Sequence, residues 1–136
     1  MRKARVKDDA VTMVALLTAC AELADLQLGR WVHARVDWEG RQQRTVLLDN
    51  ALIHMYVKCG AVEDGLRLFL EMPRRSTVSW TIMISGLAMH GRSEEALDLF
   101  HRMQERPDGA TLLAVLWACS HAGGLDDGQR YFESIA

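Results

Sequence analysis

Hydrophobic and polar residues along this chain alternate in a helical pattern. In NALIHMYVKCG, residues 50–60, apolar side chains recur three and four positions apart, which is typical of an α-helix. Gly60 follows them, where helices commonly end in a left-handed residue. The next stretch begins with the acidic residues Glu63 and Asp64, which favour the positive N-terminal end of a second helix. The pattern therefore predicts two short helices joined by a tight turn.

The same pattern occurs four times, and matching positions are 36, 31 and 32 residues apart. Such internal periodicity indicates an array of repeated units rather than a single irregular domain. The five matching columns are His33, Phe69, Phe100 and Phe132; Ala24, Gly60, Gly91 and Gly123; Leu17, Ile53, Ile84 and Leu116; Val36, Met72, Met103 and Ile135; and Gly29, Gly65, Ala96 and Gly128.

The first helix of each predicted unit is apolar on nearly all sides, as in TIMISGLAM, residues 81–89. Such a helix must be covered on two sides, which stacking of units achieves. The predicted fold class is therefore an all-α solenoid of stacked helix-turn-helix repeats, in which each unit contacts mainly its neighbours. The expected helix pairs are 12–21 with 25–36, 49–58 with 62–72, 80–89 with 93–104, and 112–121 with 125–135.

Details of packing can also be predicted. Ser93 precedes two glutamates and is expected to be a helix N-cap. The column of small residues should let the paired helices cross closely. The side chains expected to fill the space between neighbouring units are Leu66, Phe69, Leu97 and Phe100.

The stretch TVSWTIMISGLAMHGRSEEALDLFHRM, residues 77–103, resembles the pentatricopeptide repeat. It contains V-[ST]-[WY]-x-x-[ML]-I-x-G before the turn and E-E-A-L-x-L-F-x-x-M after it. The unequal unit lengths resemble the plant PLS subfamily, which alternates long, short and standard repeats. The resemblance implies a lead-in at 1–9, a long repeat at 10–45, a short one at 46–76, a standard one at 77–108 and a partial long one at 109–136. The standard repeat ends in QERPD, shorter than the family pattern, so Asp108 is expected slightly out of place.

Pentatricopeptide repeats bind single-stranded RNA, with one base per repeat read by two or three side chains. The resemblance implies that the readers are a residue near the start of the first helix and the last residue of the repeat. These pairs are Asn50 with Ser76 and Thr81 with Asp108. Family usage favours cytosine, then uracil, for the first pair and guanine for the second. Val14 and Leu113 occupy the first reader position in the long repeats and have no hydrogen-bonding side chain.

Three residues before each first reader lies an apolar residue that, by the same resemblance, helps to sandwich the base. These residues are Val11, Leu47, Val78 and Ala110. Apolar packing on a base adds affinity more than specificity. Lys58 follows Asn50 by two helical turns and is a candidate phosphate contact.

Each of these residues also has a plain structural interpretation. Asn50 is a candidate helix N-cap, and Thr81 and Lys58 are candidates for ordinary solvated helix residues. Asp108 precedes a glycine and fits an ordinary turn.

Composition limits the alternatives. The 136 residues have a net charge of −2, so any RNA contact must come from a local surface rather than from bulk charge. The three cysteines are few and widely spaced, which fits small buried hydrophobes in a reducing compartment better than a disulfide framework. No stretch is apolar and long enough to suggest a membrane span, and no clear transit peptide is visible.

No catalytic motif is found in the sequence. The zinc deaminases that edit cytidine need H-x-E and P-C-x-x-C, and no histidine here is followed two positions later by Glu, nor is there any C-x-x-C. No enzymatic activity, metal or cofactor is therefore expected.

The function expected from the resemblance is sequence-selective binding of single-stranded RNA for editing or processing in a mitochondrion or chloroplast, with catalytic factors supplied in trans. The alternatives are a protein-interaction scaffold of the tetratricopeptide kind, or a truncated remnant. The array starts and stops without polar capping units, so we also expect a piece of a longer protein, or self-association through the apolar faces at 11–17 and 131–135.

Overall fold

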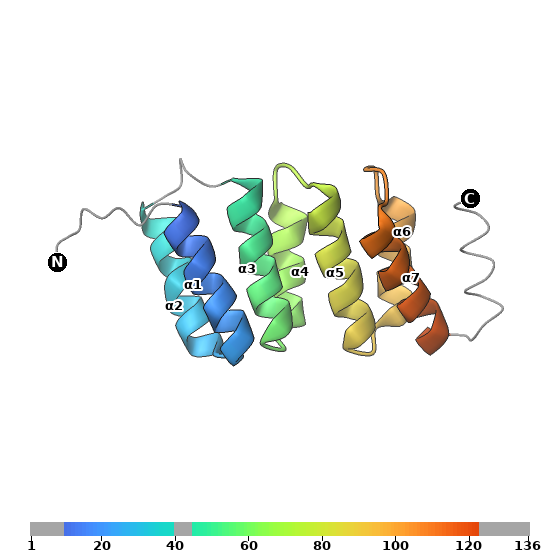
Figure 1. The fold of residues 1–136 in the computed structure, drawn as a ribbon, viewed down its shortest axis with the longest axis horizontal. Coiled ribbons are helices and arrows are strands. Elements are labelled where there is room, and N and C mark those ends of the chain that lie inside the picture. The colour runs from blue at the N-terminus through green and yellow to red at the C-terminus, as the bar shows by residue number, and fades with distance from the viewer. Residues whose placement is uncertain (1–9, 40–44, 123–136) are drawn as a thin grey trace. The chain divides into compact units, whose positions relative to one another are not determined.

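The computed structural model describes residues 10–39 and 45–122, which form α-helices and short connections (Figure 1). The described part contains no strand, so the predicted all-α class is confirmed. The helix expected at 125–135 lies outside the described residues. The helices are α1 (Ala10–Leu23), α2 (Leu26–Glu39), α3 (Val46–Lys58), α4 (Val62–Glu71), α5 (Thr77–Met89), α6 (Ser93–Arg102) and α7 (Gly109–Ala122).

The chain divides into two compact units, Met1–Pro73 and Arg74–Ala136. In the first unit α1 packs along α3, α2 packs on α1, and α4 packs on α3. In the second unit α5 packs on both α6 and α7. In the first unit the two hairpins therefore stack in sequence order, and in the second unit α7 packs next to the hairpin of α5 and α6, as the repeat pattern predicts.

The first helices carry the core of each unit because they are covered from two sides. Leu17 of α1 and Ile53 of α3 are completely buried in the first unit, and Met83 and Ile84 of α5 are completely buried in the second. These helices can be apolar all round only because a neighbouring helix covers each side.

The column of small residues marks the points where helices approach closely. A Cβ atom at Gly29 would overlap the Sδ atom of Met55, and one at Gly65 would lie 3.3 Å from Cγ2 of Val57. Ala96 occupies the same position in α6 and is completely buried. Larger side chains at these positions would push the second helices away from the first.

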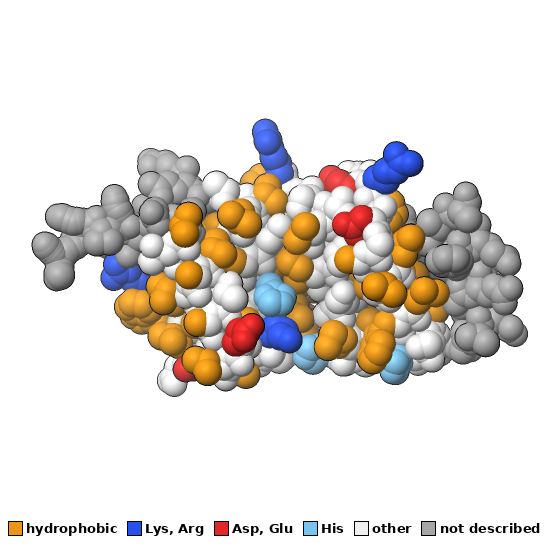
Figure 2. Space-filling model, in the orientation of Figure 1, with side chains coloured by type: hydrophobic (Ala, Val, Ile, Leu, Met, Phe, Trp, Pro, Cys, Tyr) orange, Lys and Arg blue, Asp and Glu red, His pale blue; other side chains and the backbone are white. Residues whose placement is uncertain are grey.

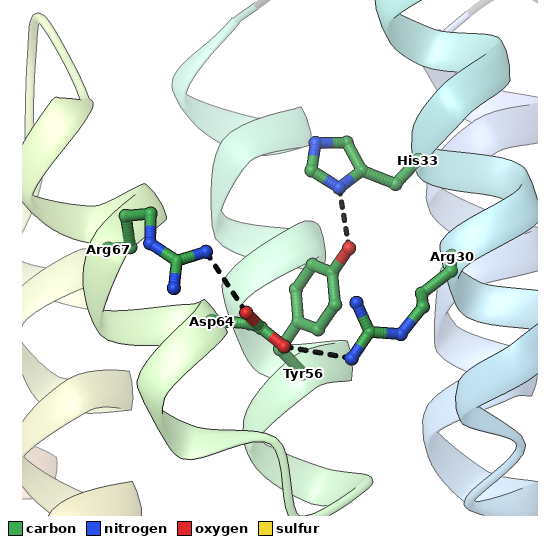
Figure 3. A network of polar contacts seen from close by, with 5 residues as sticks. All are labelled: Arg30, His33, Tyr56, Asp64 and Arg67. Atoms are coloured by element: carbon green, nitrogen blue, oxygen red, sulfur yellow. Dashed lines mark hydrogen bonds and ion pairs between the residues drawn. The ribbon is translucent and has the colours of Figure 1, made fainter.

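A polar network ties the two hairpins of the first unit together on the side of the second helices (Figure 3). Asp64 of α4 pairs with Arg30 of α2 at 2.9 Å and with Arg67 at 3.1 Å. His33 Nδ1 and Tyr56 Oη share a hydrogen bond of 2.6 Å, and the Arg30 guanidinium lies 5.8 Å from the Tyr56 ring centroid. The column that holds Phe69 and Phe100 in later repeats thus holds a hydrogen-bonding residue at His33.

The three helix-turn-helix connections among the described residues use the same backbone turn. After α3 the N–H of Ala61 donates to Tyr56 O at 2.8 Å and the N–H of Gly60 donates to Val57 O at 3.1 Å, with Gly60 at φ 87°. This is the Schellman motif, which needs a left-handed residue after the helix. The turn after α5 has Gly91 at φ 80°, but the turn after α1 places Ala24 at φ 54°.

The sequence-based helix boundaries were wrong in a systematic way. The first helices begin at Ala10, Val46, Thr77 and Gly109, two or three residues before the expected starts. Ser93 is the first residue of α6 rather than its N-cap, which is Arg92 and makes no side-chain capping bond.

The expected packing of the aromatic column was only partly right. Phe69 is completely buried and Leu97 is buried, whereas Leu66 and Phe100 are only half-buried. Phe69 is therefore the residue of this group with the greatest effect on the core.

Replacing Ala24 with glycine should stabilise the chain. A non-glycine residue in the left-handed region costs about 1–2 kcal/mol, and glycine removes this strain. Glycine also raises the conformational entropy of the unfolded chain, which offsets about 0.4–1 kcal/mol of the gain. The net gain expected in urea unfolding is roughly 0.5–1 kcal/mol. Gly60→Ala and Gly91→Ala are the matched controls and should destabilise by about 1 kcal/mol, because an alanine is strained at φ 87° and 80°. No atom lies within 4 Å of an added Cβ, so no steric clash contributes. A loss of stability in Ala24→Gly would contradict the turn assignment.

Phe69→Ala should lower the free energy of unfolding by about 3–5 kcal/mol, because a completely buried phenylalanine leaves a cavity when truncated. Phe100→Ala is the matched comparison and should cost less, because part of its ring is already in contact with solvent. Thermal melts of both variants measure the difference. Equal destabilisation would show that solvent exposure does not decide how much each ring contributes to the free energy of unfolding.

Candidate nucleic-acid interface

The residue expected to close each repeat caps the first helix of the next one. Thr45 Oγ1 accepts a hydrogen bond of 3.2 Å from the N–H of Leu48 and caps α3. Ser76 caps α5 through a reciprocal capping box with Ser79, in which the N–H of Ser76 donates to Ser79 Oγ at 3.0 Å. These caps explain why the first helices begin earlier than the apolar pattern alone indicates.

Asp108 caps α7 in the same reciprocal way. Its Oδ1 accepts from the N–H of Thr111 at 3.0 Å and from the Thr111 hydroxyl at 2.9 Å. The N–H of Asp108 donates to Thr111 Oγ1 at 3.3 Å. Asp108 is therefore a helix cap and not merely a turn residue, although its side chain stays exposed.

Hydrogen bonds to Thr111 hold the pKa of the Asp108 carboxyl below its usual range. The backbone N–H contributes most, the hydroxyl contributes next, and slight burial acts in the opposite direction. A carboxylate with a lowered pKa is ionised at neutral pH, so Asp108 can only accept hydrogen bonds there.

The four residues expected to be first readers lie in equivalent places, each the fifth residue of its helix. Asn50 is only 8% exposed inside α3, so its interpretation as an N-cap is wrong. Thr81 is half-buried in α5, and its hydroxyl lies 2.7 Å from that of Thr111. It is therefore not simply a solvated residue. Val14 is half-buried in α1, whereas Leu113 is 69% exposed on α7.

Within the second unit the structure links Thr81 to Asp108 through Thr111. Thr81 lies on α5, Asp108 lies at the start of α7, and the buried Thr111 bonds to both. The loop before Asp108 is held to the same hairpin because the Thr77 hydroxyl donates to Arg106 O at 3.1 Å. The other expected pair does not fall within one unit, since Asn50 belongs to the first and Ser76 to the second.

The four residues expected to sandwich bases are all exposed in the first turn of a first helix. Val11 is 74% exposed, Leu47 60% and Val78 53%. Most of the coloured side chains visible in Figure 2 are hydrophobic, and few are charged. Exposed apolar side chains next to polar ones suit contact with the faces and edges of bases.

Lys58 is exposed, but it is the last residue of α3. It lies eight residues beyond Asn50, about 12 Å along the helix. A contact of Lys58 with phosphate stays a prediction, and its position also suits the negative end of the helix dipole.

The residue that the sequence analysis missed is Thr111. Thr111 is the third residue of its helix, and the equivalent residues of the other first helices are Thr12, Leu48 and Ser79. Three of these four residues carry a hydroxyl group. A hydroxyl there, three residues after a capping residue, is the sequence signal of a reciprocal cap.

The described ranges contain no cluster of three metal-ligating side chains, and none of their helices is long and apolar enough to cross a membrane. Cys20 and Cys119 are buried and Cys59 is half-buried. Burial raises the pKa of the Cys20 and Cys59 thiols, with the Asp25 charge adding to both shifts. These thiols are therefore neutral and act as small packing groups.

Comparison with known proteins matches residues 50–76 and 78–107 to the PPR repeat family. A mitochondrial pentatricopeptide repeat-containing protein of Arabidopsis thaliana is 44% identical over 99% of this chain, which covers 21% of that protein. A chloroplastic one from the same plant is 40% identical over 99% of the chain, which covers 22% of it. The chain spans about a fifth of these relatives. Residues 50–76 and 78–107 of this chain are therefore similar to pentatricopeptide repeats, whose paired helices form a helical solenoid.

Proposed function

We propose that the chain binds single-stranded RNA along the N-terminal turns of its first helices, with one base per repeat. The observation that carries the proposal is the hydrogen-bonded group of Thr81, Thr111 and Asp108 between α5 and α7. Val78 lies one helical turn before Thr81, and Ala110 lies in the first turn of α7, both exposed. A base between these two first turns would have apolar contacts beside hydrogen-bonding groups.

The proposed division into repeats is 10–45, 46–76, 77–108 and 109–136, in the long, short and standard order of the PLS subfamily. The first helices begin at Ala10, Val46, Thr77 and Gly109, which supports these boundaries. The proposed preferences are a pyrimidine at Asn50 with Ser76, guanine at Thr81 with Asp108, and little selection at Val14 and Leu113. The RNA would run with its 5′ end toward the N-terminal repeat.

The proposed setting is RNA editing or processing in a mitochondrion or chloroplast, with catalysis supplied by other factors. The names of the relatives, mitochondrial and chloroplastic, support the location. Affinity of this chain alone should be weak. Stacking contributes about 1–3 kcal/mol per base, whereas association costs an estimated 4–15 kcal/mol.

RNA binding by the full chain should weaken with salt. For single strands the logarithm of the binding constant falls with the logarithm of salt concentration by about 0.7 per phosphate neutralised. Fluorescence anisotropy with a short labelled RNA, at high protein concentration and several salt concentrations, measures this slope. A flat slope together with binding to apolar peptides would favour the scaffold function. If the chain binds neither RNA nor peptides, the result would favour a truncated remnant.

Asp108→Asn should move the preference at its base from guanine toward adenine, by about tenfold for one hydrogen bond gained or lost. Asparagine also caps helices well, so α7 should remain intact. NMR titrations of the full chain with RNAs that differ only at that base measure the ratio.

Thr45→Asn is the matched control for this test. It introduces the same asparagine at another capping position, and the first reader of its proposed repeat is the apolar Val14. It should leave the ratio of guanine to adenine unchanged. If Asp108→Asn leaves that ratio unchanged as well, Asp108 serves only as a cap.

A further inference from the structure

We infer that Thr111 is a specificity-determining residue that fixes the Thr81 hydroxyl as a hydrogen-bond acceptor toward the base, beside the ionised Asp108, and so selects guanine. The inference rests on the RNA binding proposed above. Thr111 itself is completely buried, so it acts by positioning the two readers rather than by contact with RNA.

The argument begins with the single hydrogen of the Thr111 hydroxyl. A hydroxyl donates one hydrogen bond and accepts two. The ionised Asp108 can only accept, so the Thr111 hydrogen points to Asp108 Oδ1 at 2.9 Å, in a charge-assisted bond that is stronger than a neutral one. The N–H of Asp108 takes one Thr111 lone pair, at 3.3 Å.

The orientation of the Thr81 hydroxyl follows from that assignment. The two threonine hydroxyl oxygens are 2.7 Å apart, so one must donate to the other. Because the Thr111 hydrogen is already used on Asp108, Thr81 is the donor. The Thr81 hydroxyl then has only lone pairs left for a base.

Both readers therefore present acceptors, although a threonine hydroxyl alone can present either kind of group. Guanine carries two neighbouring donors on its Watson–Crick edge, N1–H and the N2 amino group, and matches two acceptors. Adenine and cytosine place an acceptor beside one donor, and uracil places its single donor between two acceptors. Each of these three bases would place an acceptor opposite an acceptor of Thr81 or Asp108. A polar group would then have no hydrogen-bond partner, which is costly.

The inference also couples neighbouring repeats. Thr81 and Asp108 belong to the proposed repeat 77–108, whereas Thr111 lies on the first helix of the next. The base preference of one repeat is then set partly by the third residue of the repeat that follows.

The test compares Thr111→Val with Thr111→Ser in the full chain. Valine keeps the shape and the backbone N–H cap but removes the hydroxyl, which frees the Thr81 hydrogen for the base. NMR titrations with short RNAs that differ only at this base should show the guanine-over-adenine ratio falling about tenfold in Thr111→Val. The ratio should be retained in Thr111→Ser, which keeps the hydroxyl. An unchanged ratio in Thr111→Val would overturn the inference and leave the proposed RNA binding standing.

A second measurement needs no RNA. The Asp108 carboxyl, followed by NMR, should have a higher pKa in Thr111→Val than in the unmodified chain, because the hydroxyl bond that stabilises its ionised form is lost. Thr111→Ser should keep the lowered pKa. If the pKa is the same in all three proteins, the hydroxyl does not bind the carboxylate and the inference fails, whatever the RNA titrations show.

A third measurement uses the unmodified chain and so does not depend on a variant folding. RNA with inosine at this base offers N1–H but lacks the N2 amino group. Binding should be about tenfold weaker than for guanine if two acceptors face the base. Equal binding of inosine and guanine would overturn the inference. No preference among the four bases in the unmodified chain would instead overturn the proposed function itself.

Discussion

The packing of one first helix against the next is the interaction on which the rest of this structure depends. α1 lies along α3 in the first unit, and α5 lies along α7 in the second. These helices are too apolar to face water, so each needs a neighbour to cover it. The same packing brings the N-terminal turns of α5 and α7 together, and the Thr81–Thr111 contact is a direct consequence. The core and the candidate interface are therefore built by one arrangement.

The residue proposed to close each repeat has one observed duty, which is helix capping, and one proposed duty, which is base reading. Thr45, Ser76 and Asp108 each satisfy backbone N–H groups at the start of the next first helix. Good caps are Ser, Thr, Asn and Asp, which are also side chains able to hydrogen-bond a base edge. A residue chosen for recognition can therefore vary within this set without loss of the helix start. Capping also limits the conformational freedom of the side chain, because the side chain is hydrogen-bonded to the start of the helix.

Much of the fold could be predicted from the sequence, because hydrophobic periodicity and turn residues act over short distances. Three of the four predicted hairpins lie in the described residues and are formed there. The left-handed turn residues coincide with one repeat column, including Ala24. The errors came from competing local signals. Ser93 precedes acidic residues as a cap would, yet it lies inside α6. The first helices begin earlier than expected because hydroxyl and carboxyl caps, rather than apolar residues, mark their starts.

The sequence by itself determined the helical class, the repeat period and the column of small residues, since each is expressed in residue type and spacing along the chain. The candidate reader positions followed from the resemblance to pentatricopeptide repeats. Only the tertiary structure decided that Phe69 is buried more deeply than Phe100, and that Thr111 joins Thr81 to Asp108. The physical reason is that burial and side-chain hydrogen bonding depend on which helices meet. Thr81 and Thr111 lie thirty positions apart in the chain. No local pattern reveals that their hydroxyl groups are in contact.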